Sequence, residues 1–441
     1  MNAAIHPPLS TEALARATLT FCLDGADALM YAALKGAGSA QEVLELIIAS
    51  RPDASGQTEA LHRLDQVFAT GLSRWGRKPT AQALAAFHRS LDGWHARLAQ
   101  LPSLNWQQLG DWFTMDGAQW IVGPDSALWP RQLMDLSTRK DWAPPLCLWG
   151  IGDAEALTCC DNPVAVVGSR GVNDYGRGVA REVAACAACD GHLVVSGGAL
   201  GTDAAAHWGA LSATQHRGLE ASGRTVAVFA GGLNHIGPPS NLRLFDQITA
   251  NGGALISELC PSTIPEPRRF LIRNRIIAAL ASTVVIAQAR LRSGALNTAG
   301  WANELGRTVV AAPGDITMPH NAGCNRLISR AEALILTSPP DIREFCHAPH
   351  PPLGSDGFND KETDGPPAGD DHLTDSQRTL IDTIRLCHRR HLTATPDALL
   401  SCMMRQANAS KPTIAQIMAD LGTLEVQGLV EYNGAANLTT G

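Results

Sequence analysis

Hydrophobic and polar positions follow two alternating patterns along the central part of this chain. Short runs of apolar and β-branched residues are separated by longer segments whose apolar residues recur at helical spacing. Because each gap is long enough for a crossover helix, the alternation predicts repeated βα units and a parallel sheet with helices on both faces. The predicted strands are Val164–Val167, Leu193–Val195, Thr225–Phe229, Ala254–Ile256, Thr283–Ala287 and Thr308–Ala311. The segment Asp174–Cys189, which follows the first strand, has helical spacing.

The regions on either side of this alternation have different patterns. Residues 1–115 are rich in Ala and Leu at helical spacing, which predicts a helical N-terminal domain before the sheet domain at 116–345. Residues 346–372 combine Pro and Gly with an excess of acidic side chains, as is typical of a linker that buries no core. Residues 373–441 contain three helix-like segments, at 376–389, 395–407 and 413–427, followed by a hairpin pattern, which predicts a small winged-helix domain.

Charge restricts the kind of nucleic-acid binding that is possible. The 441-residue chain has a net charge of −7, which argues against a protein coated in basic patches. Between Pro163 and Glu344, however, 16 arginines and no lysine stand against 13 acidic residues. Nucleic-acid binding would therefore need a local groove rather than a global field.

The remaining composition favours a folded protein of the reducing cytoplasm. The 11 cysteines are scattered, and we interpret the Cys186/Cys189 pair as helix-core residues rather than as a redox or metal motif. The first residues lack a signal-peptide pattern, and no window reaches 18 apolar residues. We expect a cytoplasmic location and no membrane contact.

Glycine-rich turns and arginines follow several of the predicted strands. Ligands of parallel sheets bind beyond the carboxyl ends of the strands. Free backbone N–H groups, helix N-termini and guanidinium groups at such a place favour an anionic ligand such as a phosphate. The residues that we expect to form this site are Gly168, Ser169 and Arg170 after the first strand, Ser196, Gly197, Gly198 and Gly201 after the second, and Ser293 and Gly294 after the fifth. Arg290 and Arg292 lie between the fifth strand and Ser293.

A cluster of arginines precedes one of the apolar helices. It contains Arg268, Arg269, Phe270, Arg273, Asn274 and Arg275. Clustered guanidinium groups contact phosphates, and Phe270 is suited to stack on a base, so the cluster extends the predicted site from one phosphate towards a polymer. For Arg273 and Arg275, pairing with a carboxylate such as that of Glu258 is an equally good interpretation.

Several enzyme classes do not fit these residues. The first turn lacks GxGxxG, Ser196 stands where a dinucleotide-binding fold has its ribose-binding carboxylate, and no turn is followed by Gly-Lys-Ser/Thr. His207 lies near Asp203, but no nucleophile accompanies it, so we interpret it as a structural histidine and Asp203 as a helix cap. The sequence gives no reason to expect catalytic residues, a cofactor or a metal.

In combination, these segments resemble the DNA-processing protein A (DprA, or Smf) family. The resemblance runs from about residue 120 to 342, and the tail at 373–440 resembles the winged-helix domain of the family. The motifs that carry it are GSR at 168–170, SGGALGTDAAAH at 196–207, SEL at 257–259, FLIRNRIIAAL at 270–280, RSGALNTAGWANELGR at 292–307, APGDI at 312–316 and NAGCNRLI at 321–328.

The resemblance implies an extended Rossmann-like domain that binds single-stranded DNA, forms a homodimer and loads the RecA recombinase during natural transformation. It carries roles in DNA binding over to Arg170 and Phe270. Family members often have a lysine three residues before this Phe, where this chain has Pro267, and we hypothesise that Arg268 or Arg269 supplies the charge. The alternative is an enzyme that hydrolyses nucleoside monophosphates, or a nucleotide sensor, of a related superfamily. Ala204–Ala206 provide no carboxylate at the position where such an enzyme needs one.

Overall fold

The computed structural model of this chain describes residues 5–346 apart from 24, 53 and 139–141, together with 374–389 and part of 394–440. The chain divides into two compact units, Met1–Gly357 and Phe358–Gly441. No helix in the described residues has both the length and the apolar character that crossing a bilayer requires.

The first unit is built on one large sheet. Over the described residues this sheet has nine strands in the order β1-β2-β6-β5-β4-β3-β7-β8-β9. All pairs from β6 to β9 in this order are parallel. The strands are β1 (Trp120–Val122), β2 (Leu148–Gly152), β3 (Val164–Gly168), β4 (Val194–Gly197), β5 (Thr225–Val228), β6 (Ala254–Ser257), β7 (Thr283–Gln288), β8 (Thr308–Ala311) and β9 (Leu334–Ile335). The six predicted strands are confirmed as β3–β8.

The expectation of a parallel sheet is wrong at one edge. Strand β2 runs antiparallel to β6, and β1 runs antiparallel to β2. Neither strand was predicted, because β1 is only three residues long and β2 contains two glycines, so neither has the β-branched run of a buried strand. Gly150 in β2 is required by its neighbour, since a Cβ there would lie 2.0 Å from the ring of Trp120. The sheet is therefore mostly parallel.

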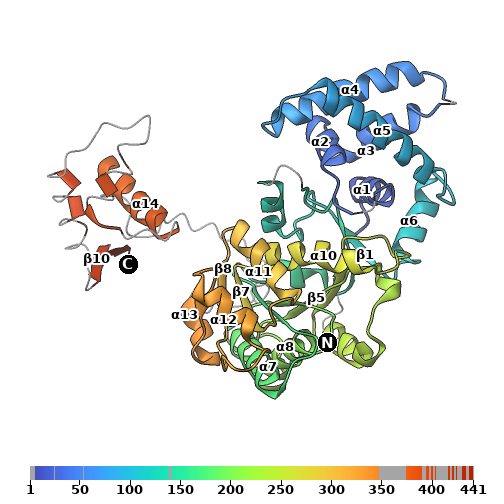
Figure 1. The fold of residues 1–441 in the computed structure, drawn as a ribbon. Helices are drawn as coiled ribbons and strands as arrows, with labels where there is room; N and C mark the ends of the chain where they lie inside the picture. Colours follow the sequence, from blue (N-terminus) through green and yellow to red (C-terminus); the bar gives the residue numbers. More distant parts are fainter. Residues whose placement is uncertain are drawn as a thin grey trace, which may run out of the picture. The chain divides into compact units, whose positions relative to one another are not determined.

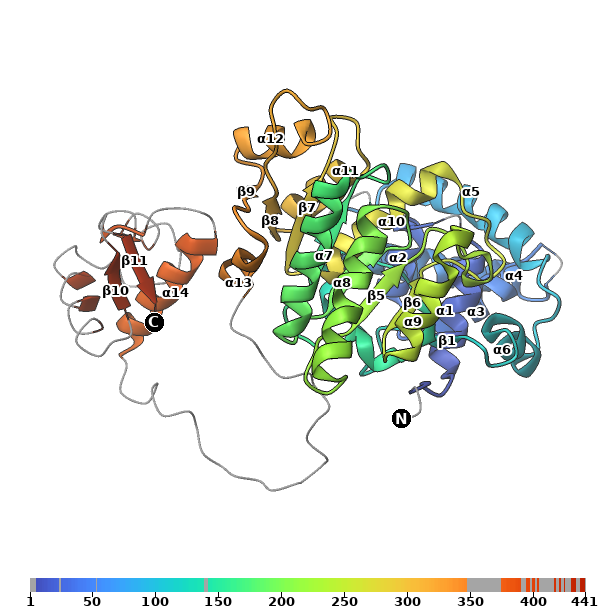
Figure 2. The same cartoon turned by 90° about the horizontal axis from the view of Figure 1, so that it is seen from below.

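Helices cover both faces of the sheet. The side chains of Val164 and Val166 in β3 pack with α7 and α8, whereas those of Ala165 and Val167 point to the core that α10 and α11 cover. Figure 1 shows these two layers on opposite sides of the sheet, and Figure 2 shows α7, α8 and α9 in front of it. The helices are α7 (Asp174–Cys189), α8 (Thr202–Arg217), α9 (Leu242–Ala250), α10 (Pro267–Leu280), α11 (Ala295–Glu304), α12 (Ala322–Ser329) and α13 (Ile342–Phe345).

The N-terminal region is helical, as predicted. Its helices are α1 (Thr11–Phe21), α2 (Ala28–Gly36), α3 (Ala40–Ala49), α4 (Gln57–Arg74), α5 (Ala81–Leu98) and α6 (Trp106–Thr114). Side-chain caps from Ser10, Ser39 and Thr80 begin α1, α3 and α5. Helices α1–α5 contribute to one core, and other residues of α1, together with residues of α6, share a second core with β1, β2 and α9. The predicted boundary at 115 thus follows the last of these helices without separating all of them from the sheet.

The second unit contains α14 (Asp375–Arg389) and the antiparallel pair β10 (Val430–Asn433) and β11 (Asn437–Thr440). These elements agree with the predicted first helix and the terminal hairpin. Most of the residues predicted to form the other two helices, and residues 347–372 of the predicted linker, lie outside the described residues. A winged helix therefore stays a prediction.

Candidate nucleic-acid interface

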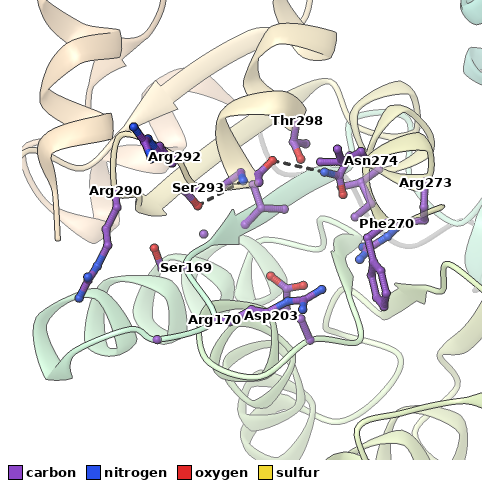
Figure 3. A pocket seen from close by; sticks show the side chains of 18 of the residues that line it. Ser169, Arg170, Asp203, Phe270, Arg273, Asn274, Arg290, Arg292, Ser293 and Thr298 are labelled. Carbon is purple, nitrogen blue, oxygen red and sulfur yellow. Dashed lines mark hydrogen bonds between the residues drawn. The ribbon is translucent and has the colours of Figure 1, made fainter. Parts of the chain in front are cut away.

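An open pocket of about 830 Å³, here called the first pocket, lies beyond the carboxyl ends of β3, β4 and β7. Its walls come from the turn after β3, the start of α8, one side of α10 and the loop from β7 to α11. Figure 3 shows Arg290 and Arg292 on one side of it, Phe270 and Arg273 on the other, and Arg170 below.

The structure brings together about half of the predicted site residues. The predicted residues that line the first pocket are Gly168, Ser169, Arg170, Phe270, Arg273, Asn274, Ser293 and Gly294. Gly198 lines a neighbouring pocket instead. The predicted residues that line neither pocket are Ser196, Gly197, Gly201, Arg268, Arg269 and Arg275.

The first turn is held by the protein itself. The backbone N–H of Ser169 donates to the carbonyl oxygen of Gln288 at 2.8 Å, and the Ser169 carbonyl accepts from both the N–H and the hydroxyl of Thr202. A Cβ on Gly168 would lie 2.6 Å from Oγ1 of Thr202, so the close approach of α8 requires glycine here. The expectation that this turn offers its N–H groups to a phosphate is therefore wrong for Ser169, and the turn instead fixes the direction of the exposed Arg170.

The second turn also serves internal packing. Ser196 is fully buried, and its hydroxyl donates to the carbonyl of Val166 at 2.6 Å. A Cβ on Gly197 would lie 2.1 Å from Nη1 of Arg273. Gly201 has φ +81°, and a Cβ there would lie 2.3 Å from the Arg170 carbonyl oxygen. These positions lie outside the first pocket because they make room for the side chains and backbone that form its wall.

The phase of helix α10 decides which of its residues reach the first pocket. Phe270, Arg273, Asn274 and Ile277 follow the i, i+3, i+4, i+7 spacing of one helix face, and all of them line the pocket. Arg275 lies off this face, fully buried, and its Nη2 pairs with Oε1 of Glu258 at 2.5 Å. The interpretation of Arg275 as a partner of Glu258 is confirmed, and a direct contact between Arg275 and DNA is excluded by its burial.

Arg170 and Phe270 form one unit within the pocket wall. The Arg170 guanidinium carbon lies 4.7 Å from the centre of the Phe270 ring, a cation–π contact that leaves the charged group exposed. This contact joins the turn after β3 to helix α10, which are distant in sequence. A cation and an aromatic face are thus presented together.

Arg290 and Arg292 add positive charge on the far side of the first pocket. Both are exposed, and Nη2 of Arg290 lies 2.8 Å from Nε2 of His320. Sequence reasoning noted these arginines only as the path to Ser293. The available signal was their position directly beyond the end of β7, at the same sheet edge as Gly168.

Asp203 is the one carboxylate among the described residues that line the first pocket. Burial raises the pKa of its carboxyl group, while Arg273 opposes this shift. It does not act as the predicted N-cap, because helix α8 begins after Gly201 without a side-chain cap. The carboxylate instead adds a negative charge beside the buried Arg273.

His207 holds the second turn from behind. It is fully buried, with Nδ1 at 2.7 Å from the Thr225 hydroxyl and Nε2 at 3.0 Å from the Gly197 carbonyl. Burial lowers the pKa of His207 to about 4, so the ring is neutral at pH 7. These contacts agree with a structural role. No group of three or more His, Cys, Asp or Glu side chains in the described part of the chain is arranged to hold a metal ion.

The sequence model of the family called DNA recombination-mediator protein A matches residues 120–347. The chain belongs to this family. A DprA-type protein of Mycobacterium tuberculosis is 38% identical over 317 residues, which cover 70% of this chain and 74% of that protein.

Two solved structures of family members are similar to this chain. DNA processing protein A of Streptococcus pneumoniae superposes on this chain with a TM-score of 0.50 at 27% identity. The match covers 71% of this chain and 96% of the Streptococcus pneumoniae chain. DNA processing protein A of Helicobacter pylori, solved in a study of how it binds single-stranded DNA, matches with a TM-score of 0.43 at 27% identity over 50% of this chain and 93% of its own.

The arginines beside Pro267 were expected to supply charge to the site. Pro267, which stands where the resemblance implies a lysine, is the first residue of α10. Arg268 pairs with Glu266 at 3.1 Å, and the mostly buried Arg269 donates to the Ile264 carbonyl. Since neither arginine lines the first pocket, the structure does not support the hypothesis that one of them replaces this lysine.

Proposed function

We propose that this member of the recombination-mediator family is a non-enzymatic protein that binds single-stranded DNA across the first pocket. In this proposal it acts in the cytoplasm as a homodimer, protects incoming DNA and loads RecA during natural transformation. The observation that carries the DNA-binding part is the Arg170–Phe270 unit, which presents an exposed cation and an aromatic ring to one open pocket.

The geometry supports a single strand as the ligand. Exposed arginines at 170, 290 and 292 supply charge for successive phosphates, and such contacts do not depend on sequence. An aromatic side chain stacks on a base only when that base is unpaired and turned outwards. A polymer with phosphates at intervals and free bases matches both features, whereas the bases of a regular duplex are stacked on one another and do not offer their faces.

A salt titration of DNA binding tests this proposal. Arg170→Ala is expected to weaken binding of an oligothymidylate and to reduce the slope of log affinity against log salt by about 0.7 to 1, the value for one lost phosphate contact. Arg330→Ala is the matched control, because Arg330 is similarly exposed but lies outside both pockets. Equal affinities and slopes for wild type and a folded Arg170→Ala variant would refute the role of this residue.

Incubation with nucleoside monophosphates distinguishes binding from hydrolysis. The proposal predicts no release of free base from AMP or its analogues over hours. Asp203 offers a carboxylate, but it lies beside Arg273, whose charge it balances. Base release that is lost in an Asp203→Asn variant would favour the enzymatic alternative.

The family description as a recombination mediator supports the RecA part of the proposal. The full chain is expected to accelerate RecA assembly on single-stranded DNA, and a chain without residues 358–441 shows whether the second unit contributes. Sedimentation tests the homodimer, which would have twice the 46.7 kDa mass of one chain.

A further inference from the structure

A groove of about 550 Å³, here called the N-terminal groove, lies between the start of α1, helix α6 and strand β1. Its walls come from residues between 6 and 14, from one face of α6, from the turn that follows α6 and from residues 119–121. It shares no lining residue with the two pockets beyond the carboxyl ends of the strands. Its volume is within the roughly 300–1,000 Å³ that is typical of ligand pockets, so it is a separate candidate site.

Contacts within the first unit fix the walls of the N-terminal groove. The Ser10 hydroxyl donates to Oδ2 of Asp125 at 3.1 Å, which holds the segment before α1. A Cβ on Gly110 of α6 would lie 3.2 Å from Cδ2 of Leu9, so this segment packs directly against the helix. The groove is therefore formed by the chain itself and needs no ligand to shape it.

Exposed apolar side chains border the N-terminal groove. Leu9 and Trp106, the first residue of α6, line it, and each is 37% exposed. Ile5, Leu104 and Met115 are exposed to a similar degree and flank the lining segments in sequence. Single exposed apolar side chains are ordinary in proteins, whereas a concentration of them marks an interaction surface. Because tryptophan contributes strongly where protein surfaces meet, these residues favour a protein as the partner.

The N-terminal groove is acidic. Asp111 and Asp116 line it and are both exposed, and no lysine or arginine is among the described residues that line it. The other ionisable side chain in this lining is that of His6. Asp111 accepts from Nε2 of Gln107 at 3.2 Å, which leaves carboxylate lone pairs available. Since the first pocket is lined by arginines, the two sites have opposite charge, and this groove attracts a cation rather than a DNA strand.

Gln119 provides a hydrogen-bond acceptor that the protein does not use. Its side chain lines the groove but is only 5% exposed, and Oε1 has no hydrogen-bond partner among the described residues. The backbone N–H of Gln119 donates to the Thr114 carbonyl at 2.8 Å, which fixes the position of the residue. Because a buried acceptor without a donor is unfavourable, this oxygen indicates a donor that arrives with a ligand.

We propose that the N-terminal groove docks a segment of a partner protein in which a lysine or arginine stands next to a large apolar side chain. The cationic group contacts Asp111 and Asp116, and the apolar side chain packs against Trp106. A donor of the same segment reaches Oε1 of Gln119. Charge complementarity determines the occupant, and the chain's own linker at 346–372 is acidic and does not match it. The proposal is separate from DNA binding and goes beyond the function proposed above.

Fluorescence anisotropy with two labelled dodecapeptides tests the proposal on the full chain. One peptide contains lysines and leucines at helical spacing. In the other, every leucine is replaced by serine, so both peptides carry the same charge. The chain is expected to bind the Lys/Leu peptide at least about tenfold more tightly, because only this peptide has both parts of the proposed occupant. Equal affinities, or no binding of either peptide, would overturn the proposal.

Asp111→Asn tests the charged part of the site. It is expected to weaken binding of the Lys/Leu peptide by about two- to fivefold at low salt and by less at high salt, as for one exposed ion pair. Glu45→Gln is the matched control, because Glu45 is also exposed and also accepts from a glutamine four residues earlier, but lies outside the groove. Equal affinities of the two variants would show that the peptide binds elsewhere.

Two further variants test the apolar contact and the unused acceptor. Trp106→Ala should weaken the Lys/Leu peptide at least about fivefold, whereas Leu219→Ala, at a position 38% exposed and outside the groove, should not. Gln119→Leu removes an acceptor without a partner, so it should lower the affinity at least about threefold without lowering the midpoint of urea unfolding. Unchanged affinity with a lower midpoint would show that Oε1 of Gln119 serves the fold and not a partner.

DNA binding and sedimentation separate this proposal from its alternatives. The three groove variants should bind an oligothymidylate as wild type does, which would support a docking site separate from the DNA site. A wild-type chain that binds no DNA would refute the proposed function without affecting the peptide result. Trp106→Ala should have the wild-type mass in sedimentation. A smaller mass would assign the groove to a second copy of this chain and overturn the partner protein.

Discussion

Lowering the pH from 7 to 5 is expected to destabilise the first unit through His207. The ring is fully buried with both nitrogens in contact with the protein, and burial lowers its pKa from 6.5 to about 4. The unfolded chain therefore takes up a proton on His207 at a higher pH than the folded chain does. The contribution of the neutral ring is fully present above pH 6.5 and is lost as the pH falls towards 4.

The size of the effect follows from the two pKa values. Proton linkage with 6.5 in the unfolded state and about 4 in the folded state gives a loss of about 2 kcal/mol between pH 7 and pH 5. Buried carboxyl groups with raised pKa values, such as those of Asp203 and Glu258, have the opposite pH dependence. The wild-type curve alone is therefore insufficient, and the measurement is the difference between wild type and His207→Gln.

Urea unfolding followed by tryptophan fluorescence measures this difference. All ten tryptophans lie at or before residue 301, so the signal reports the first unit alone. His207→Gln should be less stable than wild type at pH 7 but should lose about 2 kcal/mol less between pH 7 and pH 5. His216→Gln, at an exposed position on the same helix, should follow the wild-type curve. Parallel curves for wild type and His207→Gln would show that His207 is not held neutral by burial.

Two further substitutions test how the site is supported, each by the same fluorescence assay. Gly197→Ala places a Cβ 2.1 Å from Nη1 of Arg273 and should destabilise the first unit by about 1–3 kcal/mol; Gly178→Ala, a helix position with open space, should be neutral or stabilising by up to about 1 kcal/mol, and equal effects would contradict the packing argument. Glu258→Gln removes the charge that pairs with the fully buried Arg275 and should be destabilising by about 3–5 kcal/mol, whereas a loss below 1 kcal/mol would show that this pair is not needed.

The strands of the parallel part of the sheet and the helix after the first of them were predictable, because the hydrophobic pattern of this region is strongly periodic. The prediction of a helix at Asp174–Cys189 matches α7 at both ends. The ends of each predicted strand differ from those of the observed strand by at most two residues. Strands β1 and β2 were missed because a strand of three residues or one with two glycines has no periodic signal. Their antiparallel direction depends on pairing with β6, which local sequence does not encode.

The candidate site was predictable in its location but not in its details. Strand ends and glycine turns placed Gly168–Arg170 and the α10 arginines at one sheet edge, since all parallel strands end there. They did not determine which arginines face outwards. That depends on the phase of α10 and on Glu258, which reaches Arg275 from a distant strand end. The choice between DNA contact and ion pair at Arg273 and Arg275 therefore needed tertiary structure.

The glycines of these turns have a different role in the structure from the one expected at a phosphate site. A glycine that exposes backbone N–H groups and a glycine that allows another group to pack closely cannot be distinguished in a sequence. Here Gly197 admits the guanidinium of Arg273, and Gly201 admits the backbone of Arg170. Both glycines thus position arginines that line the first pocket. Arg273 is buried, and two of its nitrogens have no partner among the described residues, whereas Arg170 is exposed and packs on the ring of Phe270. Under the proposed function, these arginine side chains supply the charge at this edge, whereas the N–H of Ser169 is already bonded to the Gln288 carbonyl.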